Sequence, residues 1–338
     1  MRRPPLARPL RPRPRAGCPA GRVVGILFSL SLAAPLAAAT VRVPADAATI
    51  AAALAAAQPG DTVLVDAGTY VEHDLTVPSA VVLRGATGDP RDVVLDGALA
   101  GRVLTLEGTS PGTVVEGLTL RRGLATGSGG AVAVLGGAPV IRDCRLEQNV
   151  AGGDGGALYV FEGAPLVERC AFTGNHSAGS TGGAVASRQS HPVLRHCTFT
   201  NNFAPGWGGA VYASGMAPRL EKCELRSNRS YYGGGVAANG ADITLDRVVL
   251  RDNRAEHSGG GVLLAFGANL AATESEWSGN AAPEGKDVLV GGGCSALFRC
   301  CTLDPSTVAG GGPVTFDDTG CGVANAPLSW SALKQQYR

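Results

Sequence analysis

Short runs of alternating apolar and polar residues recur along the chain and are separated by turn-forming residues. One kind of run follows a glycine pair, as in Gly129-Gly130-Ala131-Val132, and another has the form of Cys170-Ala171-Phe172. In an extended chain the first and third side chains of such a run share one face. No repeat contains a sustained apolar stripe at helical spacing, and a glycine pair in each repeat would weaken a helix. The pattern therefore predicts an all-β chain of short strands.

Three markers recur together at a nearly constant interval. Glycine pairs begin at Gly129, Gly155, Gly182, Gly208, Gly233 and Gly259, with spacings of 26, 27, 26, 25 and 26 residues. A column of mostly small residues runs through Cys144, Cys170, Cys197, Cys223, Val248, Ser275 and Cys301. A column of asparagines runs through Asn149, Asn175, Asn202, Asn228, Asn253 and Asn280. A fixed interval of this length indicates stacked repeats that share one core.

Stacking explains why the columns exist. We expect a right-handed single-stranded parallel β-helix over residues 40–320, a solenoid whose regular repeats span residues 129–280. Adjacent coils would lie about 4.8 Å apart, so equivalent residues form ladders. The cysteine column suits an inward ladder of small groups, glycine suits tight corners, and asparagine tolerates left-handed turns and can bond the backbone of the next coil. An alanine-rich segment, residues 47–57, is expected to form an N-terminal capping helix with Thr49 near its start.

The first 39 residues predict export through a signal peptide. A leader rich in arginine precedes an apolar run over residues 23–36, which is short for a membrane span, and Ala37-Ala38-Ala39 follows. Cleavage is expected before Thr40, with an uncleaved anchor as the alternative. The protein would then be extracellular, at the cell surface or periplasmic. The mature chain has no other stretch apolar enough to cross a bilayer.

Composition narrows the classes of partner. The chain contains 49 glycines, 5% aromatic residues and a formal net charge of +1. Abundant glycine with few aromatics suits a turn-rich β chain. A charge this close to zero gives no electrostatic case for binding nucleic acid or an anionic membrane.

Two resemblances follow from these motifs. Thr49-Ile50-Ala51-Ala52-Ala53-Leu54, Pro59-Gly60-Asp61-Thr62-Val63 and Gly68-Thr69-Tyr70 resemble the opening of pectin-lyase-like β-helix proteins. The repeats resemble those of polymorphic outer-membrane proteins, which pair Phe-x-x-Asn with Gly-Gly-Ala-Ile/Leu/Val, as in Phe172-Thr173-Gly174-Asn175 and Phe199-Thr200-Asn201-Asn202. The resemblance covers roughly residues 41–320 and implies the fold. It does not decide the activity, because this fold carries lyases, hydrolases, epimerases and adhesins.

We find no linear constellation of catalytic groups. A lyase-like Ca²⁺ site takes six or more oxygens, which Asp143 and Asp154 do not supply. A polygalacturonase-like hydrolase needs clustered carboxylates, and the adjacent pair Asp317-Asp318 is instead expected in a polar turn. Alginate-epimerase-like sites carry an Asp-Pro-His-Glu run. The nearest match, Asp89-Pro90-Arg91-Asp92, lacks the histidine, and we expect it to form a turn. The pair His191 and His196 leaves only a weak case for zinc. We therefore expect no cofactor and no metal, with Ca²⁺ possible only under the uronate-lyase alternative.

A binding face is the stronger hypothesis. The residue before each glycine pair forms the column Ser128, Asp154, Thr181, Trp207, Tyr232 and Ser258. Trp207 and Tyr232 would lie on consecutive coils, with Tyr231 beside them and Tyr159 and Tyr212 just past their own glycine pairs. Flat aromatic rings on one edge suit sugar rings or a partner surface, although ordinary packing over a corner would also explain them.

The sequence thus predicts an exported, non-catalytic β-helix that binds a polysaccharide or a cell-surface partner. The alternative is a polysaccharide-active enzyme, a uronate lyase or glycoside hydrolase, whose carboxylates converge from different coils. A purely structural spacer is a third possibility.

Nine cysteines in an exported chain raise the question of disulfides. We expect the four ladder cysteines to be free and buried, because parallel stacked side chains fit a disulfide poorly. Cys294, Cys300 and Cys321 lie off the ladder, and we expect a bridge between Cys294 and Cys321. Residues 321–338 form a tail, which we interpret as a cap or a sorting segment.

Overall fold

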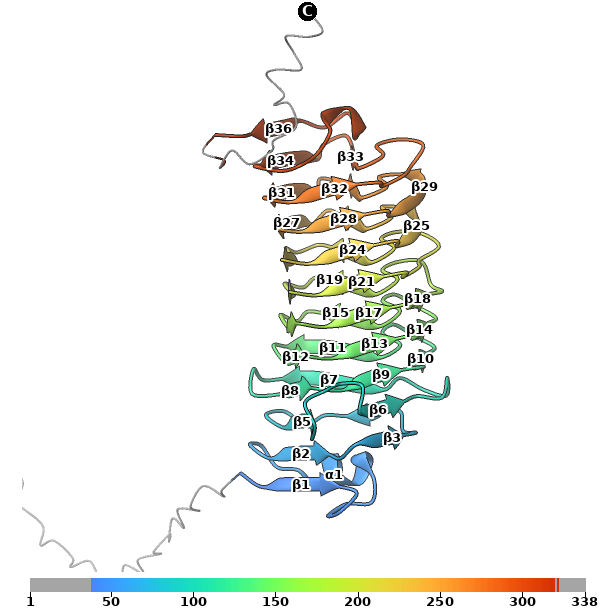
Figure 1. Cartoon of the computed structure of the whole chain (residues 1–338), viewed down its shortest axis with the longest axis vertical. Helices are drawn as coiled ribbons and strands as arrows, with labels where there is room; N and C mark the ends of the chain where they lie inside the picture. Colours follow the sequence, from blue (N-terminus) through green and yellow to red (C-terminus); the bar gives the residue numbers. More distant parts are fainter. Residues whose placement is uncertain (1–37, 320, 322–338) are drawn as a thin grey trace, which may run out of the picture. The chain divides into compact units, whose positions relative to one another are not determined.

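The computed structural model describes residues 38–319 and Cys321. In this part the backbone winds into coils that stack one above the next (Figure 1). The expected signal peptide, up to residue 37, and the expected tail, from residue 322, lie outside the described residues. The helices of the described part are α1 (Ile50–Ala56) and a single 3-10 turn, Pro305–Thr307. No helix in residues 38–319 is long and apolar enough to span a membrane.

Three parallel sheets run along the stack. Sheet A has 12 strands: β1 (Thr40–Val43), β2 (Thr62–Val65), β5 (Val82–Gly85), β8 (Val114–Glu116), β12 (Val140–Arg142), β16 (Leu166–Glu168), β20 (Val193–Arg195), β23 (Arg219–Glu221), β27 (Asp242–Asp246), β31 (Asn269–Thr273), β34 (Ser295–Arg299) and β36 (Val314–Asp317). Sheet B has nine: β3 (Gly68–Tyr70), β6 (Val93–Asp96), β9 (Thr119–Arg121), β13 (Arg145–Glu147), β17 (Ala171–Thr173), β21 (Thr198–Thr200), β24 (Glu224–Arg226), β28 (Val249–Arg251) and β32 (Glu276–Ser278).

Sheet C has 10 strands: β4 (Leu75–Thr76), β7 (Leu104–Thr109), β11 (Val132–Gly137), β15 (Leu158–Phe161), β19 (Val185–Arg188), β22 (Val211–Ser214), β26 (Val236–Asn239), β30 (Val262–Ala265), β33 (Val288–Val290) and β35 (Val308–Gly310). Between sheets B and C lie two small sheets, of β10 (Leu124–Ala125), β14 (Val150–Ala151) and β18 (His176–Ser177), and of β25 (Arg229–Tyr232) and β29 (Arg254–Ser258).

The register reproduces the sequence period. Val132 of β11 pairs with Leu158 of β15, which pairs with Val185 of β19. Every strand pair is parallel, and each strand pairs with its equivalent one coil later, so the runs after the glycine pairs become sheet C and the runs after the cysteine column become sheet B. The predicted all-β solenoid with coils of about 26 residues is confirmed.

The corner between sheets A and B is a two-residue turn from β12 onward. Its first residue is left-handed, with φ of 54° at Asp143 and 51° at Arg169. Its second residue is the small-residue column. The same left-handed geometry precedes the asparagines, at Gln148 with φ 53° and Asn201 with φ 55°. The structure therefore corrects one expectation, since the left-handed position is the residue before the ladder asparagine and not that asparagine itself.

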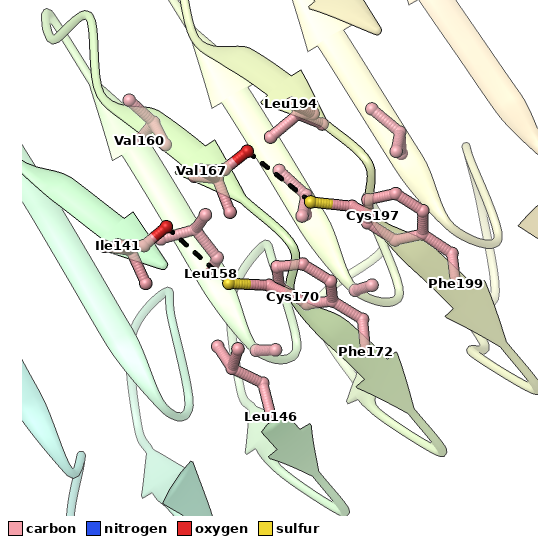
Figure 2. Packing of buried hydrophobic residues seen from close by; sticks show 14 of the residues in the cluster. Ile141, Leu146, Leu158, Val160, Val167, Cys170, Phe172, Leu194, Cys197 and Phe199 are labelled. Atoms are coloured by element: carbon pink, nitrogen blue, oxygen red, sulfur yellow. Dashed lines mark hydrogen bonds between the residues drawn. The ribbon is translucent and has the colours of Figure 1, made fainter. Parts of the chain in front are cut away.

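The cysteine column is buried inside the coils. Cys144, Cys170, Cys197 and Cys223 are at most 2% exposed, and none of them is in a disulfide. Cys170 donates its thiol hydrogen to the carbonyl oxygen of Ile141 in the coil below (3.6 Å), and Cys197 does the same to Val167 (3.5 Å; Figure 2). Ser275 holds the same slot with a hydroxyl bond to Thr273 O at 2.9 Å. The position takes a small side chain; cysteine and serine there donate to a backbone carbonyl, and Val248 fills the same buried slot without a donor.

The asparagine column forms a continuous buried ladder. The Nδ2 group of Asn175 donates to Oδ1 of Asn202 (3.0 Å) in the next coil and to the carbonyl oxygen of Leu146 (2.9 Å) in the coil below. Oδ1 of Asn202 also accepts from the backbone N–H of Asn175 at 3.0 Å. Because each carboxamide satisfies groups in two neighbouring coils, the ladder fixes the register of the stack.

Helix α1 packs against β1, β2 and β4 at the N-terminal end of the stack. The Thr49 hydroxyl accepts from the Ala52 N–H at 3.1 Å, so Thr49 is the N-cap. The Glu72 carboxylate accepts from the N–H groups of Ile50 and Ala51, each at 2.9 Å. The apolar side of α1 therefore covers the first coils, within the range 47–57 expected from the sequence.

The C-terminal coils carry a disulfide between Cys300 and Cys321, with 5.4 Å between their Cα atoms. The expected Cys294–Cys321 pairing is wrong. Cys294 is 1% exposed and its thiol belongs to the core, whereas Cys300 occupies the left-handed corner position after β34, where side chains point outward. The sequence showed that Cys294 and Cys300 both lie off the ladder but not which of them faces out.

Candidate functional site

The outward face of sheet C carries the predicted aromatic residues. The second residue of each strand points away from the core, and in register these residues are Ala133, Tyr159, Ala186, Tyr212, Ala237, Leu263 and Leu289. Small alanines alternate with large side chains in the first part of this column. Tyr159, Trp207 and Tyr232 pack against its buried members. We call Tyr159, Trp207, Tyr212, Tyr231 and Tyr232 the aromatic face.

Trp207 and Tyr232 lie on consecutive coils, as the sequence predicted. They form a parallel bridge, and their ring centroids are 5.0 Å apart with a tilt of 40° between the planes. Tyr231 meets Tyr232 edge-on at 4.7 Å. Both distances fall in the range of favourable aromatic pairs. The side chains therefore form one connected aromatic group and not isolated rings.

Exposure differs across the aromatic face. Tyr231 is 40% exposed, and Trp207 and Tyr232 are half-buried. Tyr212 is only 4% exposed: it packs in a cluster with Ala186, Ala237 and Leu263, and the Arg188 guanidinium lies over its ring at 5.3 Å. Burial raises the pKa of the Tyr159 phenol. Tyr212 is thus the floor of the face, Tyr231 is exposed, and Tyr159, Trp207 and Tyr232 are partly exposed.

Three residues of this surface were missed by the sequence argument. Phe266 is 73% exposed, and its ring lies 6.1 Å from that of Trp207. His257 lies 5.5 Å from the Tyr231 ring. Arg188 pairs with Asp154 at 2.7 Å. None of the three stands in one of the recurring columns. Only Phe266 carries a sequence signal, because it is a large apolar residue in a turn.

The candidate carboxylates are not brought together. Asp143 lies at the corner between sheets A and B and pairs with Arg169 at 2.7 Å. Asp154 lies beside sheet C, where it accepts the Thr181 hydroxyl hydrogen at 2.5 Å as well as pairing with Arg188. Asp317 pairs with Arg299 at 3.1 Å on the last coils, and hydrogen bonds from Thr319 lower its pKa. Within residues 38–319, no group of three histidine, cysteine or carboxylate side chains could hold a metal ion.

The Asp89 turn is also explained locally. The Arg91 guanidinium donates to both carboxylate oxygens of Asp89, at 3.0 and 3.1 Å from Nε. These bonds, with the Arg91 backbone N–H, hold the pKa of Asp89 at about 2. The turn expected from its sequence is therefore closed by its own ion pair.

Comparisons with known proteins agree with the fold. Residues 112–247 match the family model described as "Right handed beta helix region". None of the curated proteins matches the sequence.

Solved structures similar to this one include three enzymes. They are a polygalacturonase from Erwinia carotovora ssp. carotovora (11% identity, TM-score 0.41, 87% of this chain and 96% of that chain), the pectin methylesterase PemA from Erwinia chrysanthemi (13%, 0.33, 89% and 96%) and a pectin methylesterase in complex with hexasaccharide VII (10%, 0.31, 88% and 94%). With identities and TM-scores this low, nothing about their activities is carried over. The match over residues 112–247 and the stacked parallel sheets show that this chain has the fold of a right-handed parallel β-helix.

Proposed function

We propose that this protein binds a polysaccharide through the aromatic face on sheet C and does not cleave it. The observation that carries the proposal is the pair of Trp207 and Tyr232, whose rings lie 5.0 Å apart on consecutive coils beside the exposed rings of Tyr231 and Phe266. Aromatic rings with one apolar surface and one polar tip suit a sugar, which presents both C–H and hydroxyl groups.

Polar groups border the rings. The ion pair of Asp154 and Arg188 lies next to Tyr212, and His257 lies 5.1 Å from the Tyr232 ring. Such groups can exchange hydrogen bonds with sugar hydroxyls while the rings cover the apolar sugar face. We propose further, from the leader in the first 39 residues, that binding takes place outside the cytoplasm. A cell-surface protein partner is the other occupant that this surface suits.

Binding is tested by isothermal titration calorimetry and affinity electrophoresis of the chain from residue 40 against pectate, alginate and neutral glycans. Each aromatic ring that stacks on the ligand contributes about 0.5–1.5 kcal/mol, so Trp207→Ala with Tyr232→Ala should weaken binding by roughly tenfold or more. Phe203→Ala is the matched control, because the Phe203 ring packs on His176 and not on the aromatic face. Circular dichroism establishes that each variant is folded.

Two outcomes would contradict the proposal. Equal glycan affinity of the double variant and the Phe203→Ala control would remove the aromatic face from the binding site. Release of unsaturated uronates or new reducing ends above a heat-inactivated control, with or without Ca²⁺, would show a polysaccharide-active enzyme, which is the alternative function.

A further inference from the structure

One corner of the solenoid is longer than its equivalents. Between β12 and β13, and at the matching corners of the coils that follow, two residues join sheet A to sheet B. Between β5, which ends at Gly85, and β6, which begins at Val93, the corner contains residues 86–92 instead. In a regular solenoid, an insertion at one coil commonly forms a binding wall.

The insertion is held against sheet B. The Thr119 hydroxyl of β9 donates to the carbonyl oxygen of Pro90 at 2.6 Å, which covers the β9 rung. The Gly68 N–H donates to the carbonyl oxygen of Asp92 at 2.8 Å, and the Asp89–Arg91 pair closes the loop on itself. These bonds make the loop a fixed wall at one end of an open stretch of sheet B.

Beyond that wall lies a groove with a volume of about 590 Å³. Its floor follows the register of sheet B, in which Arg145 of β13 pairs with Ala171 of β17 and Ala171 pairs with Thr198 of β21 (strands labelled in Figure 1). The small Ala171 side chain leaves a hollow between the two polar neighbours. The left-handed residues at the corners between sheets A and B, Asp143, Arg169 and His196, form the side of the groove.

The charged side chains of the groove are ion-paired, but several of its hydrogen-bond donors have no protein acceptor. Asp143 is bound by Arg169 through two hydrogen bonds of 2.7 and 2.9 Å, and Asp89 is bound by Arg91, so both carboxylates are neutralised. Arg145 also forms an ion pair, from Nε to Glu147 at 2.6 Å, and its Nη groups donate to no other described residue. The exposed His196 ring and the exposed Thr198 hydroxyl form no hydrogen bond with another residue among 38–319 and Cys321. Donors without an acceptor therefore surround the Ala171 hollow.

We propose that this groove binds an oxyanion, the carboxylate or phosphate group of a small ligand, over Ala171. Arg145, Thr198 and His196 supply the hydrogen bonds, since a guanidinium with free nitrogen atoms and a neighbouring hydroxyl form strong charge-assisted bonds to such a group. The groove lies on sheet B and the aromatic face on sheet C, so this site is independent of the proposed polysaccharide binding.

The test is calorimetric titration at low ionic strength with inorganic phosphate and with citrate as probes. Arg145→Gln should weaken binding about tenfold, the size expected for one charge-assisted hydrogen bond. Ala171→Phe should abolish binding by filling the hollow, and Thr198→Val gives a near-isosteric loss of one donor. Arg226→Gln is the matched control, because Arg226 lies in β24 of the same sheet and outside the groove.

The two probes distinguish the possible ligands of the groove. Phosphate binding without citrate binding would assign a phosphate ligand, and the reverse would assign a carboxylate. If neither probe binds the unmodified protein, or if Arg145→Gln binds as tightly as Arg226→Gln, the proposal is overturned.

Discussion

Asn280 donates an Nδ2 hydrogen to Oδ1 of Asp287 over 2.8 Å, and this bond closes the asparagine ladder. Asn253, one coil below, donates to Oδ1 of Asn280 at 3.0 Å. The coil above Asn280 brings no ladder asparagine among the described residues, so a carboxylate from residue 287 takes the place of the next carboxamide. Asp287 is 6% exposed and therefore replaces water as the acceptor.

Asp287→Ala should destabilise the protein by about 1–3 kcal/mol, because it leaves the buried Asn280 donor without an acceptor. Asp287→Asn retains an acceptor oxygen and should cost less. Urea unfolding followed by circular dichroism measures both. Equal midpoints for Asp287→Ala and the unmodified protein would show that the ladder needs no closing group.

An asparagine inside the ladder should contribute more to the free energy of unfolding than the Asp287 that closes its end. Asn202→Ala removes the acceptor for the Asn175 backbone and side chain and the donor to the carbonyl of Phe172. Three buried groups then lack partners, so we expect a loss larger than that of Asp287→Ala and above about 3 kcal/mol. Unfolding midpoints of the two variants, measured side by side, give the comparison. The reverse order would contradict a ladder whose strength lies in its interior bonds.

The columns explain why the fold could be predicted. A residue that stacks on its own equivalent must satisfy the same environment in each coil, so Cys170, Cys197 and Ser275 repeat in the sequence because they share one buried slot. Period, strand positions and the end-capping helix follow from such repetition. The left-handed conformation of the corner residues does not follow from it, because the residue type at that position is not repeated: it is Asp143 in one coil and Lys222 in another.

The surfaces were less predictable, since they depend on residues that do not repeat. Trp207 and Tyr232 were found because they stand in a column, whereas Phe266 reaches Trp207 from a turn two coils away. The groove over Ala171 depends on a single insertion and on a bond from Thr119 to Pro90. No periodic signal marks such features, and the choice of Cys300 over Cys294 as the partner of Cys321 depends on side-chain direction alone.

Acid should weaken the N-terminal coils through Asp96, whose side chain is fully buried. Burial alone would raise the pKa of this carboxyl, but hydrogen bonds from Arg122 (2.6 Å), the Ala98 N–H (2.9 Å) and Arg121 (2.9 Å) outweigh it and lower the pKa below 3.8. A lowered folded-state pKa contributes stability that is present above the unfolded pKa and is lost as pH falls through the folded one.

The measurement is the urea midpoint between about pH 6 and pH 2 for the unmodified protein and Asp96→Asn. Asp96→Asn should be less stable above about pH 4 and should lose less stability on further acidification. Parallel curves for the two proteins would contradict the assignment.

The ladder thiols should be unreactive in the folded protein. Burial raises the pKa of the Cys170 thiol, so little of the reactive thiolate exists at neutral pH. All four ladder thiols are at most 2% exposed, so a reagent cannot reach their sulfur atoms in the folded protein. A chromogenic disulfide reagent should therefore label Cys144, Cys170, Cys197 and Cys223 only after unfolding in urea. Cys197→Ser, which copies Ser275, should lower the unfolded count by one thiol and leave the folded count unchanged. Rapid stoichiometric labelling of the folded protein would contradict the buried ladder.

The second glycine of each pair should tolerate no side chain. A Cβ atom on Gly183 would lie 2.2 Å from the carbonyl oxygen of Gly209 in the next coil. That oxygen belongs to the backbone of a stacked coil, so it cannot move aside as a flexible side chain would. Gly183→Ala should therefore destabilise the protein by more than about 3 kcal/mol through overpacking. The control is Gly127→Ala, since a Cβ there meets nothing within 4 Å and its φ is not positive. That substitution should be neutral or stabilise by up to about 1 kcal/mol, because alanine reduces the entropy of the unfolded chain. Thermal and urea unfolding of both variants separate the two cases: comparable stability of Gly183→Ala and Gly127→Ala would mean that the coils are not as closely stacked at the glycine corner as the backbone contacts require.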